Sequence, residues 1–295
     1  MRVGQLCELA KAHLGDQYNF SSLAIPKRPN WRIKFWIARQ KPGAIYIFSK
    51  FAARVWRKDH IAELRRKAAG ICVDYVDLPL DEIVHKGVDF HLSTSYAGQK
   101  AIDTIIAQSL SKGSPIQGES RLLLHNVDRA FDNFQARPQP NLATAYLGMK
   151  ESTFTTLEIE KQVTFLDGSQ KSSFDENVQR LQNFNFHYCI RDDQTDELVR
   201  SYKPFTKGFI AARCGANLLI NRNVDDAEEF LGEDYPYFVE SNDPAEILEG
   251  LEKARRTFEK KEWNDAQKIG KEIANRVSHN VITTQLGSVL AELHS

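Results

Sequence analysis

The feature that most constrains the fold is an alternation of strand-like and helix-like segments, which runs twice along the 295 residues. Apolar, β-branched runs alternate with segments of helical spacing, as in AIYIFSK, RKDHIAELRRKAA and GICVDYVD (44–50, 57–69 and 70–77). Strands separated by helices in this way are typical of parallel β-α-β units. The sequence therefore predicts an α/β protein.

The alternation has two parts, separated by the two prolines of RPQPN (137–141). The first part continues with a strand at 89–95, a helix at 101–112 and a strand at 121–128. The second has strands at 142–148, 162–167, 184–192, 216–220 and 236–240, helices at 173–183 and 225–232, and helices from Pro244 onward. We predict two Rossmann-like, doubly wound parallel-sheet domains that face a central cleft, over residues 1–138 and 139–295.

The charge is distributed unevenly, although the formal net charge is +0. Residues 1–70 contain 15 Lys and Arg against 4 Asp and Glu, whereas the remaining residues contain 24 against 35. In WRIKFWIARQK, the aromatic Trp31 and Trp36 alternate with Arg32 and Lys34. These four side chains form either a face for an anionic membrane or an acceptor, or a solvated helix whose tryptophans pack inward. No recognised nucleic-acid module accompanies the charge, which argues against nucleic acid as a partner.

The sequence shows neither a long apolar run nor a secretory signal pattern at its N-terminus. Its four cysteines are scattered within apolar stretches, which is typical of reduced core thiols rather than of disulfides or zinc ligands. We therefore expect a cytoplasmic protein. Peripheral attachment to the inner face of the membrane follows if the basic segment binds lipid.

Polar residues at the predicted strand ends are the first candidates for a functional site, because open parallel sheets bind ligands beyond the carboxyl ends of their strands. His125, in LLLHNVD, is the first candidate for a catalytic polar group that touches a substrate; its alternative is a structural role. Asp77 and Asp74 are the second candidates, as a general base. In the second part, the same rule selects Gly148, Arg191 and Asn223.

The stretch KPFTKGFIAARCG predicts a helix that begins with cationic residues. Pro204 suits a first helical turn because its missing N–H would have no partner there. Lys203, Thr206 and Lys207 place positive charge and donors at the positive end of the helix dipole, which favours a phosphate or diphosphate. In the alternative interpretation, the lysines simply face solvent. Small residues keep the helix close to the sheet, and Gly215 ends it.

With these residues, with AYLG at the start of the second part and with a helical tail, the chain resembles the nucleotide-sugar glycosyltransferases of the GT-B fold, most closely over 184–232. The resemblance implies metal-independent transfer of a sugar, without a cofactor, from a nucleotide-sugar donor to a glycan or lipid-linked acceptor, as in polysaccharide biosynthesis. It implies that Gly148 lies near the donor phosphates and that Lys203, Thr206 and Lys207 hold the diphosphate. Arg191 is a further phosphate candidate, and Asp225 and Glu228 are candidates for hydrogen bonds to sugar or ribose hydroxyls.

The sequence departs from the family at two positions. Many members carry two glutamates eight positions apart in this segment, where Tyr202 and Ile210 stand here. A catalytically silent, glycosyltransferase-like binding module that acts through its basic N-terminal face is therefore the alternative function. A nucleotide-dependent oxidoreductase is less consistent with the sequence, since no G-x-G-x-x-G follows an early strand.

Overall fold

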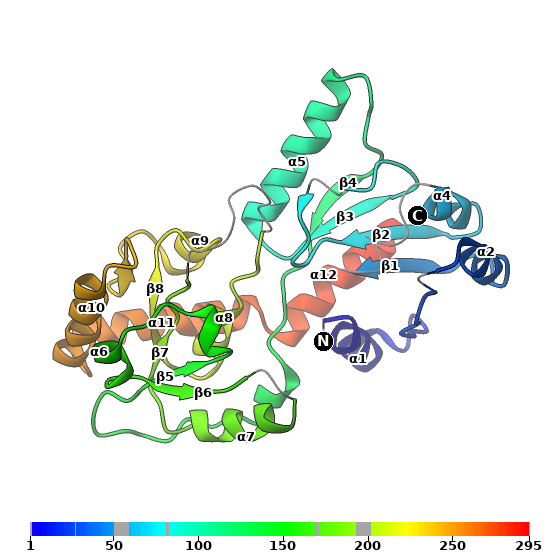
Figure 1. Ribbon diagram of the computed structural model, residues 1–295. Helices are drawn as coiled ribbons and strands as arrows, with labels where there is room; N and C mark the ends of the chain where they lie inside the picture. The colour runs from blue at the N-terminus through cyan, green and yellow to red at the C-terminus, as the bar shows by residue number, and fades with distance from the viewer. Residues whose placement is uncertain are drawn as a thin grey trace. The chain divides into compact units, whose positions relative to one another are not determined.

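The computed structural model describes residues 2–26, 28–49, 59–80, 83–168, 171–192 and 202–294 (Figure 1). The described residues divide into two compact units. Unit 1 comprises 2–125, 202–204 and 279–294, and unit 2 comprises 126–192 and 205–278. The junction thus lies earlier than the predicted 138/139, because the turn η2 (Arg129–Phe131) packs in unit 2, where the buried ring of Phe131 contacts that of Phe174 at 6.2 Å.

Unit 1 is built on a parallel four-stranded sheet with the strands in chain order, β1-β2-β3-β4. The strands are β1 (Ile45–Ser49), β2 (Gly70–Asp74), β3 (Phe90–Ser93) and β4 (Glu119–Leu122). Its crossover helices include α4 (Asp59–Arg65) and α5 (Tyr96–Ser111), and α2 (Asn30–Ala38) precedes β1. The buried core joins Ile71 and Val73 of β2 to Ile61 and Leu64 of α4.

Two helices from opposite parts of the sequence complete unit 1. Helix α1 (Arg2–Leu14) packs against α12 (His279–Glu292). The residue after α12, Leu293, lies so close to β2 that a side chain at Gly70 would come within 2.8 Å of its Cδ1 atom. Gln285 of α12 accepts a hydrogen bond from the backbone N–H of Leu124 at 3.0 Å. The last helix of the sequence is therefore part of the first unit.

Unit 2 is built on a parallel five-stranded sheet of order β6-β5-β7-β8-β9. The strands are β5 (Thr144–Leu147), β6 (Thr164–Leu166), β7 (Phe186–Tyr188), β8 (Asn217–Asn221) and β9 (Phe238–Val239). The helices are α6 (Leu157–Glu160), α7 (Lys171–Leu181), α8 (Thr206–Arg213), α9 (Ala227–Leu231), α10 (Pro244–Thr257) and α11 (Lys261–Arg276). An aromatic cluster of Phe186, Tyr237 and Trp263 joins the sheet to α11, with ring centroids 5.3 to 6.1 Å apart.

The predicted α/β class with two parallel sheets is confirmed. Each predicted strand has an observed counterpart, and most observed strands are shorter. The predicted strand 121–128 corresponds to β4, which ends at Leu122, because the next carbonyl groups accept hydrogen bonds from the Arg2 side chain instead of extending the sheet. The predicted helix 101–112 begins earlier, at Tyr96, where Ser95 caps it by accepting from the Gly98 N–H at 3.1 Å. Among the described helices, none combines the length and the apolar composition needed to cross a bilayer.

Candidate active site

The reversal of strand order in unit 2 places its candidate site. The order β6-β5-β7 means that the chain crosses from β5 to one neighbour and then to the other, so that the loops after β5 and β7 diverge at their carboxyl ends. Such switch points are where open α/β sheets bind ligands. The loop after β5 begins with Gly148, and Arg191 lies three residues beyond β7. The structure therefore brings two predicted site residues to the switch point.

The surroundings of Gly148 leave no room for a side chain. Its φ angle is +152°, and a Cβ atom there would lie 2.6 Å from Nζ of Lys207 and 2.9 Å from the hydroxyl oxygen of Tyr146. The backbone also approaches a second glycine, because a Cβ atom at Gly168 would lie 3.2 Å from Cα of Gly148. These contacts explain the glycine in AYLG by the close approach of a lysine and a second chain segment.

Lys207 reaches back from the second residue of α8 to the end of β5. Its ammonium group donates a hydrogen bond to the carbonyl oxygen of Leu147 and lies 4.0 Å from the centroid of the Tyr146 ring. The side chain is partly buried, and this burial lowers the pKa of Lys207 to about 8, with a further decrease caused by the charge of Arg191. No carboxylate of the described residues forms an ion pair with it. A desolvated cation without a carboxylate suits an anionic ligand.

The start of α8 differs from its prediction in detail. The helix begins at Thr206, its N-cap is Phe205, and no side chain caps it by a hydrogen bond. Pro204 is buried ahead of the helix rather than in its first turn, and Lys203 is exposed. The N-cap Phe205 provides no side-chain cap, and the amide groups of the first turn lie at the positive end of the helix dipole, where an anion is favoured.

The remainder of α8 follows the prediction. A Cβ atom at Gly208 would overlap the ring of Phe205, and Ala211 and Ala212 are buried. Gly215 follows the helix with a φ of +67° and donates its N–H to the Ala212 carbonyl at 3.1 Å. The small residues and the terminal glycine therefore have the packing and capping roles expected of them.

Arg191 is held by its backbone at the edge of the switch point. Its N–H donates to Oδ1 of Asn221, at the end of β8, at 3.0 Å, and its carbonyl accepts from Nδ2 of Asn242 at 2.9 Å. Asn221 and Asn242 are joined to each other by a hydrogen bond of 2.9 Å. The two asparagines thus fix the main chain from which the Arg191 side chain extends.

His187 is a further buried component of this region. It sits on β7, is 4% exposed, and its Nε2 atom has no hydrogen-bond partner among the described residues. Burial lowers the pKa of His187 to about 3, and the charge of Lys207 adds to the decrease. Buried polar atoms are rarely left without a partner. No sequence pattern marks this histidine, because its environment depends on how α8 packs.

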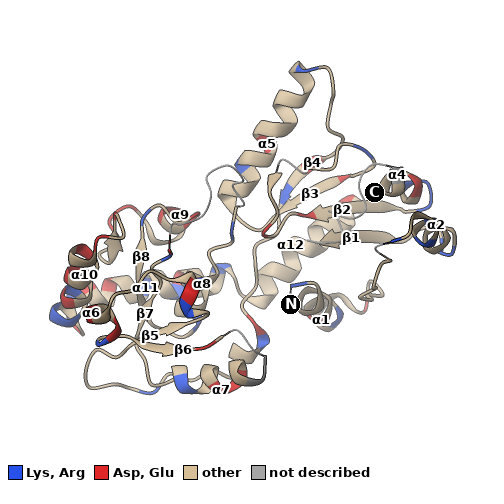
Figure 2. Ribbon diagram, in the orientation of Figure 1, with Lys and Arg blue, Asp and Glu red and all other residues tan. Residues whose placement is uncertain are grey.

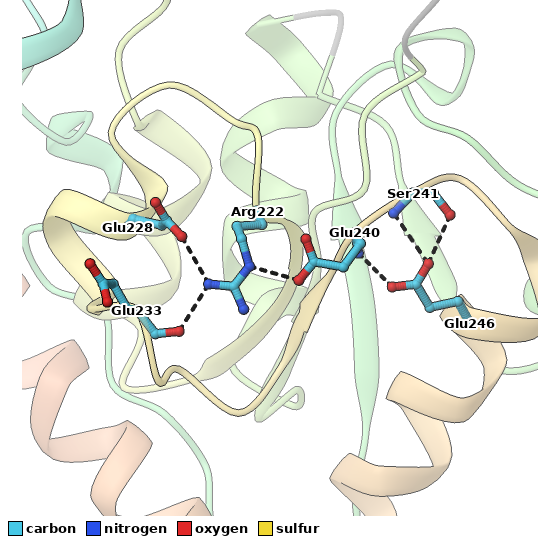
Figure 3. A network of polar contacts seen from close by, with 6 residues as sticks. All are labelled: Arg222, Glu228, Glu233, Glu240, Ser241 and Glu246. Carbon is cyan, nitrogen blue, oxygen red and sulfur yellow. Dashed lines mark hydrogen bonds and ion pairs between the residues drawn. The ribbon is translucent and has the colours of Figure 1, made fainter.

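Asn223 and Asp225 lie in the turn after β8, and Glu228 lies in α9; Asn223 and Glu228 are exposed and Asp225 is partly buried. Glu228 is engaged with Arg222, whose NH1 group donates to Oε1 of Glu228 at 2.9 Å and to the carbonyl of Glu233 at 2.9 Å (Figure 3). The Nε group of Arg222 donates to Glu240 at 2.7 Å. Glu228 is therefore part of an ion-pair network that connects α9 to the end of β9.

In unit 1, the structure separates the three predicted catalytic candidates by their surroundings. Asp74 is 1% exposed, and its Oδ2 atom accepts a hydrogen bond from Nε of the equally buried Arg2 at 2.6 Å. Asp74 Oδ1 accepts from the Val76 N–H at 3.1 Å. A carboxylate committed in this way holds structure. Asp77 is exposed with a φ of +52°, and His125 is partly buried. These two remain the accessible candidates.

A groove of about 900 Å³ runs along α5 in unit 1. Its lining includes Leu80, Ile83, Ile105 and Tyr202, with Lys100 and Lys112 among the polar residues. The described part of the connection between β2 and β3, at 75–80 and 83–89, contains no α-helix, which leaves this side of α5 open. None of the three predicted catalytic candidates lines the groove. Tyr202, which stands where many GT-B enzymes carry a glutamate, lines this groove in unit 1.

The sequence matches no protein-family model. A search of curated proteins also found no match. Solved structures, in contrast, do match. HepE of Anabaena in complex with UDP has a TM-score of 0.61 at 10% identity, over 98% of this chain and 96% of that chain. A glycosyltransferase from Rickettsia africae has a TM-score of 0.57 at 11% identity, over 97% and 88%.

An E. coli trehalose-6-phosphate structure bound with UDP-2-fluoro glucose also matches, with a TM-score of 0.57 at 10% identity, over 89% of this chain and 76% of that chain. At sequence identities this low, the structural similarity establishes the fold of this chain. The similarity to these structures covers nearly the whole chain and therefore includes both parallel sheets. The chain therefore has the GT-B glycosyltransferase fold.

Proposed function

We propose that this protein transfers a glycosyl unit from a nucleotide diphosphate sugar to an acceptor, and that unit 2 binds the donor through its diphosphate. The proposal rests on the surroundings of Lys207. Its partly buried ammonium group has no carboxylate partner among the described residues and lies close to Gly148, where there is no room for a side chain. Its position at the switch point agrees with where such sheets bind nucleotides. Structural neighbours bound to UDP and to UDP-2-fluoro glucose support the donor class.

The chemistry follows from this arrangement. The bond between the anomeric carbon and the β-phosphate oxygen breaks, and its electron pair remains on the departing nucleoside diphosphate. Lys207, Arg191 and the first amide groups of α8 stabilise that growing negative charge. An acceptor hydroxyl oxygen forms the new bond to the anomeric carbon. In this reaction the cationic groups stabilise the departing diphosphate, a role that a metal ion has in other enzymes. Metal independence is therefore part of the proposal.

The proton of the acceptor hydroxyl requires a base if the reaction inverts the anomeric configuration. His125 and Asp77 are the proposed candidates, because both are accessible whereas Asp74 is buried against Arg2. A retaining reaction would depend more on the leaving phosphate and on close positioning. The proposed acceptor is a glycan or a lipid-linked glycan, as in polysaccharide biosynthesis.

A thermal-shift panel tests the donor site. UDP, GDP, CMP, ADP and dTDP are added to the wild type, to Lys207→Met and to Lys112→Met, which removes an exposed lysine from unit 1 as the control. A ligand present at 100 times its dissociation constant stabilises the native state by about 2.7 kcal/mol. We expect one nucleotide to raise the melting temperature of the wild type and the control but not of Lys207→Met. An equal shift in all three proteins, or none with any nucleotide, contradicts the proposal.

The catalytically silent module is the second candidate, and one observation favours it. Tyr202 and Ile210 occupy positions where many GT-B enzymes carry glutamates, and Ile210 lies partly buried on α8, where a glutamate would meet the donor ribose in those enzymes. Nucleotide binding followed by no release of nucleoside diphosphate from any nucleotide sugar, across a panel of acceptors, is the result that selects this function.

A further inference from the structure

Helix α2 has apolar side chains on two opposite faces, although it is only nine residues long. Its inner face places Ile33 and Ile37, 3% and 2% exposed, in the core of unit 1. Its outer face places Trp31 and Phe35, four residues apart, in solvent, with exposed fractions of 63% and 56%. A helix that is apolar on both faces buries only one of them within its own domain.

The outer face cannot be buried by a rotation of the helix, because hydrogen bonds to the C-terminal turn fix α2 on unit 1. The ammonium group of Lys67 donates to the carbonyl oxygens of Ala38, at 2.6 Å, and Ile37, at 3.3 Å. The side chain of Gln40 donates to the Trp36 carbonyl at 2.8 Å and accepts from the hydroxyl group of Tyr46, on β1, at 3.4 Å. The exposed aromatic rings are therefore a fixed feature of this surface.

Trp36 belongs to the inner side of α2. It packs against the core, and its ring meets that of Tyr46 edge-on at 6.2 Å. Of the residues predicted for the membrane or acceptor face, Trp31, Arg32 and Lys34 are exposed, whereas Trp36 is partly buried. Phe35 takes its place on the outer face, which the alternating sequence alone did not reveal.

Cations surround the two exposed rings. The guanidinium carbon of Arg32 lies 5.4 Å from the ring centroid of Trp31, and that of Arg39 lies 5.3 Å from that of Phe35. Lys34 is exposed on the same helix, and α2 carries no acidic residue (Figure 2). The sequence from 17 to 58 contains ten Lys and Arg and no Asp or Glu. We call Trp31, Arg32, Lys34, Phe35 and Arg39 the α2 face.

We propose that the α2 face docks the protein on an anionic lipid bilayer. Tryptophan and phenylalanine partition to the boundary between head groups and acyl chains, while neighbouring Arg and Lys attract anionic head groups. A second copy of the chain is a poor occupant, because two α2 faces would bring like charges together. The inference goes beyond the proposed glycosyl transfer and does not depend on it, although docking would bring a lipid-linked acceptor within reach.

Vesicle co-sedimentation with the full chain tests the proposal. The vesicles are made of phosphatidylglycerol and phosphatidylcholine in equal amounts, or of phosphatidylcholine alone. The aromatic pair is removed in Trp31→Ser/Phe35→Ser, and its control is Leu110→Ser/Leu157→Ser, which removes two exposed leucines elsewhere, 64% and 74% exposed. The charge pair is reversed in Arg32→Glu/Arg39→Glu, and its control is Lys86→Glu/Lys112→Glu, which changes the net charge equally at exposed sites.

We expect the wild type and both controls to bind the anionic vesicles, more weakly as salt is added, and to bind the neutral vesicles poorly. The aromatic pair should lower the affinity on the order of tenfold or more. The charge pair should lower it by about 25-fold or more, at about fivefold for each charge removed. All variants change exposed residues, and equal melting temperatures confirm their folding.

Three results overturn the proposal. The first is a wild type that fails to bind the anionic vesicles. The second is an equal loss of binding in a matched control: in Lys86→Glu/Lys112→Glu it would mean that net charge alone attracts the protein, and in Leu110→Ser/Leu157→Ser that exposed apolar residues elsewhere contribute as much as the α2 face. The third is self-association of the wild type that Trp31→Ser/Phe35→Ser abolishes without any vesicle binding, which would make the α2 face a contact between copies. The nucleotide-induced thermal shift should be the same in all these variants, so that failure of docking and failure of the proposed function are distinguishable.

Discussion

The ammonium group of Lys207 donates a hydrogen bond to the carbonyl oxygen of Leu147, so that the start of α8 is connected to the end of β5. The ring of Tyr146, which precedes Leu147, lies 4.0 Å from the same ammonium group. The cation is thus positioned before any ligand binds. A site arranged in advance stabilises charge that develops on a leaving group without reorganising first.

Gly148→Ala should disrupt this arrangement. The new Cβ atom would meet Nζ of Lys207 at 2.6 Å, at a φ of +152° that side chains rarely adopt. We expect a loss of unfolding free energy of about 1 to 3 kcal/mol and loss of the nucleotide-induced thermal shift. Urea unfolding and the thermal-shift panel measure the two effects.

The matched control for this change is Gly232→Ala, also in unit 2. Gly232 has a φ of +82°, but a Cβ atom there would meet nothing within 4 Å. The Gly232→Ala variant should lose stability through backbone strain alone, and its nucleotide-induced thermal shift should be unchanged. If Gly148→Ala retains a full nucleotide shift, the close approach of Lys207 to Gly148 is not needed for phosphate binding.

The depressed pKa of Lys207 should make part of the stability depend on pH. The native pKa is about 8, below the unfolded value of about 10.4, so between these values the unfolded state binds more protons and stability increases with pH. Below about pH 8 both states are protonated and the cost of burying the charge is fully present. The free energy of unfolding of the wild type, relative to Lys207→Met, should rise by about 2 kcal/mol between pH 8 and pH 10. A pH-independent difference between the two proteins contradicts the assignment.

The lowered pKa of Lys207 also predicts that the protein takes up protons when the nucleotide binds. At pH 8 about half of the Lys207 side chains are neutral, and a bound diphosphate favours the charged form. Calorimetry in two buffers of different ionisation enthalpy should therefore show uptake of up to about half a proton per nucleotide bound. Lys207→Arg, which stays charged, serves as the comparison and should show none from this position.

Asp74→Ala should act on stability and not on nucleotide binding. It leaves the guanidinium of Arg2 buried without its carboxylate, which lies 2.6 Å away in the wild type. Breaking a buried pair in this way costs about 3 to 5 kcal/mol of unfolding free energy, measured in urea. Glu249→Ala, which breaks an exposed pair with Arg256, should change little. A stable Asp74→Ala protein that has lost turnover would return Asp74 to the list of catalytic bases.

His125→Gln tests the choice of base. For an inverting reaction we expect kcat to fall by about 100-fold or more, with the nucleotide-induced thermal shift unchanged, because the base acts on the acceptor. Asp77→Asn is the parallel variant at the other accessible candidate. If neither change lowers kcat, the acceptor proton leaves by another route, and the stereochemistry of the product should be examined for retention.

The sequence carried enough information to predict the architecture, because local signals determine it. The apolar strand that contains Leu218 and Leu219, the small residues before it and Gly215 all have the expected roles. The reach of Lys207 to Leu147 spans 60 positions and depends on how α8 packs, which no local pattern encodes. The pairing of Arg2 with Asp74, across 72 positions, was missed for the same reason, and it removed an accessible base from the candidates.

The assignment of α12 to unit 1 has a consequence for synthesis on the ribosome. The strands of unit 1 emerge first, but the helix that packs against α1 and bonds to Leu124 is translated only after all of unit 2. At typical translation rates, roughly 150 intervening residues delay it by about 8 to 30 s. During that interval the nascent first unit exposes the surface that α12 later covers, whereas unit 2 is already complete and can fold first.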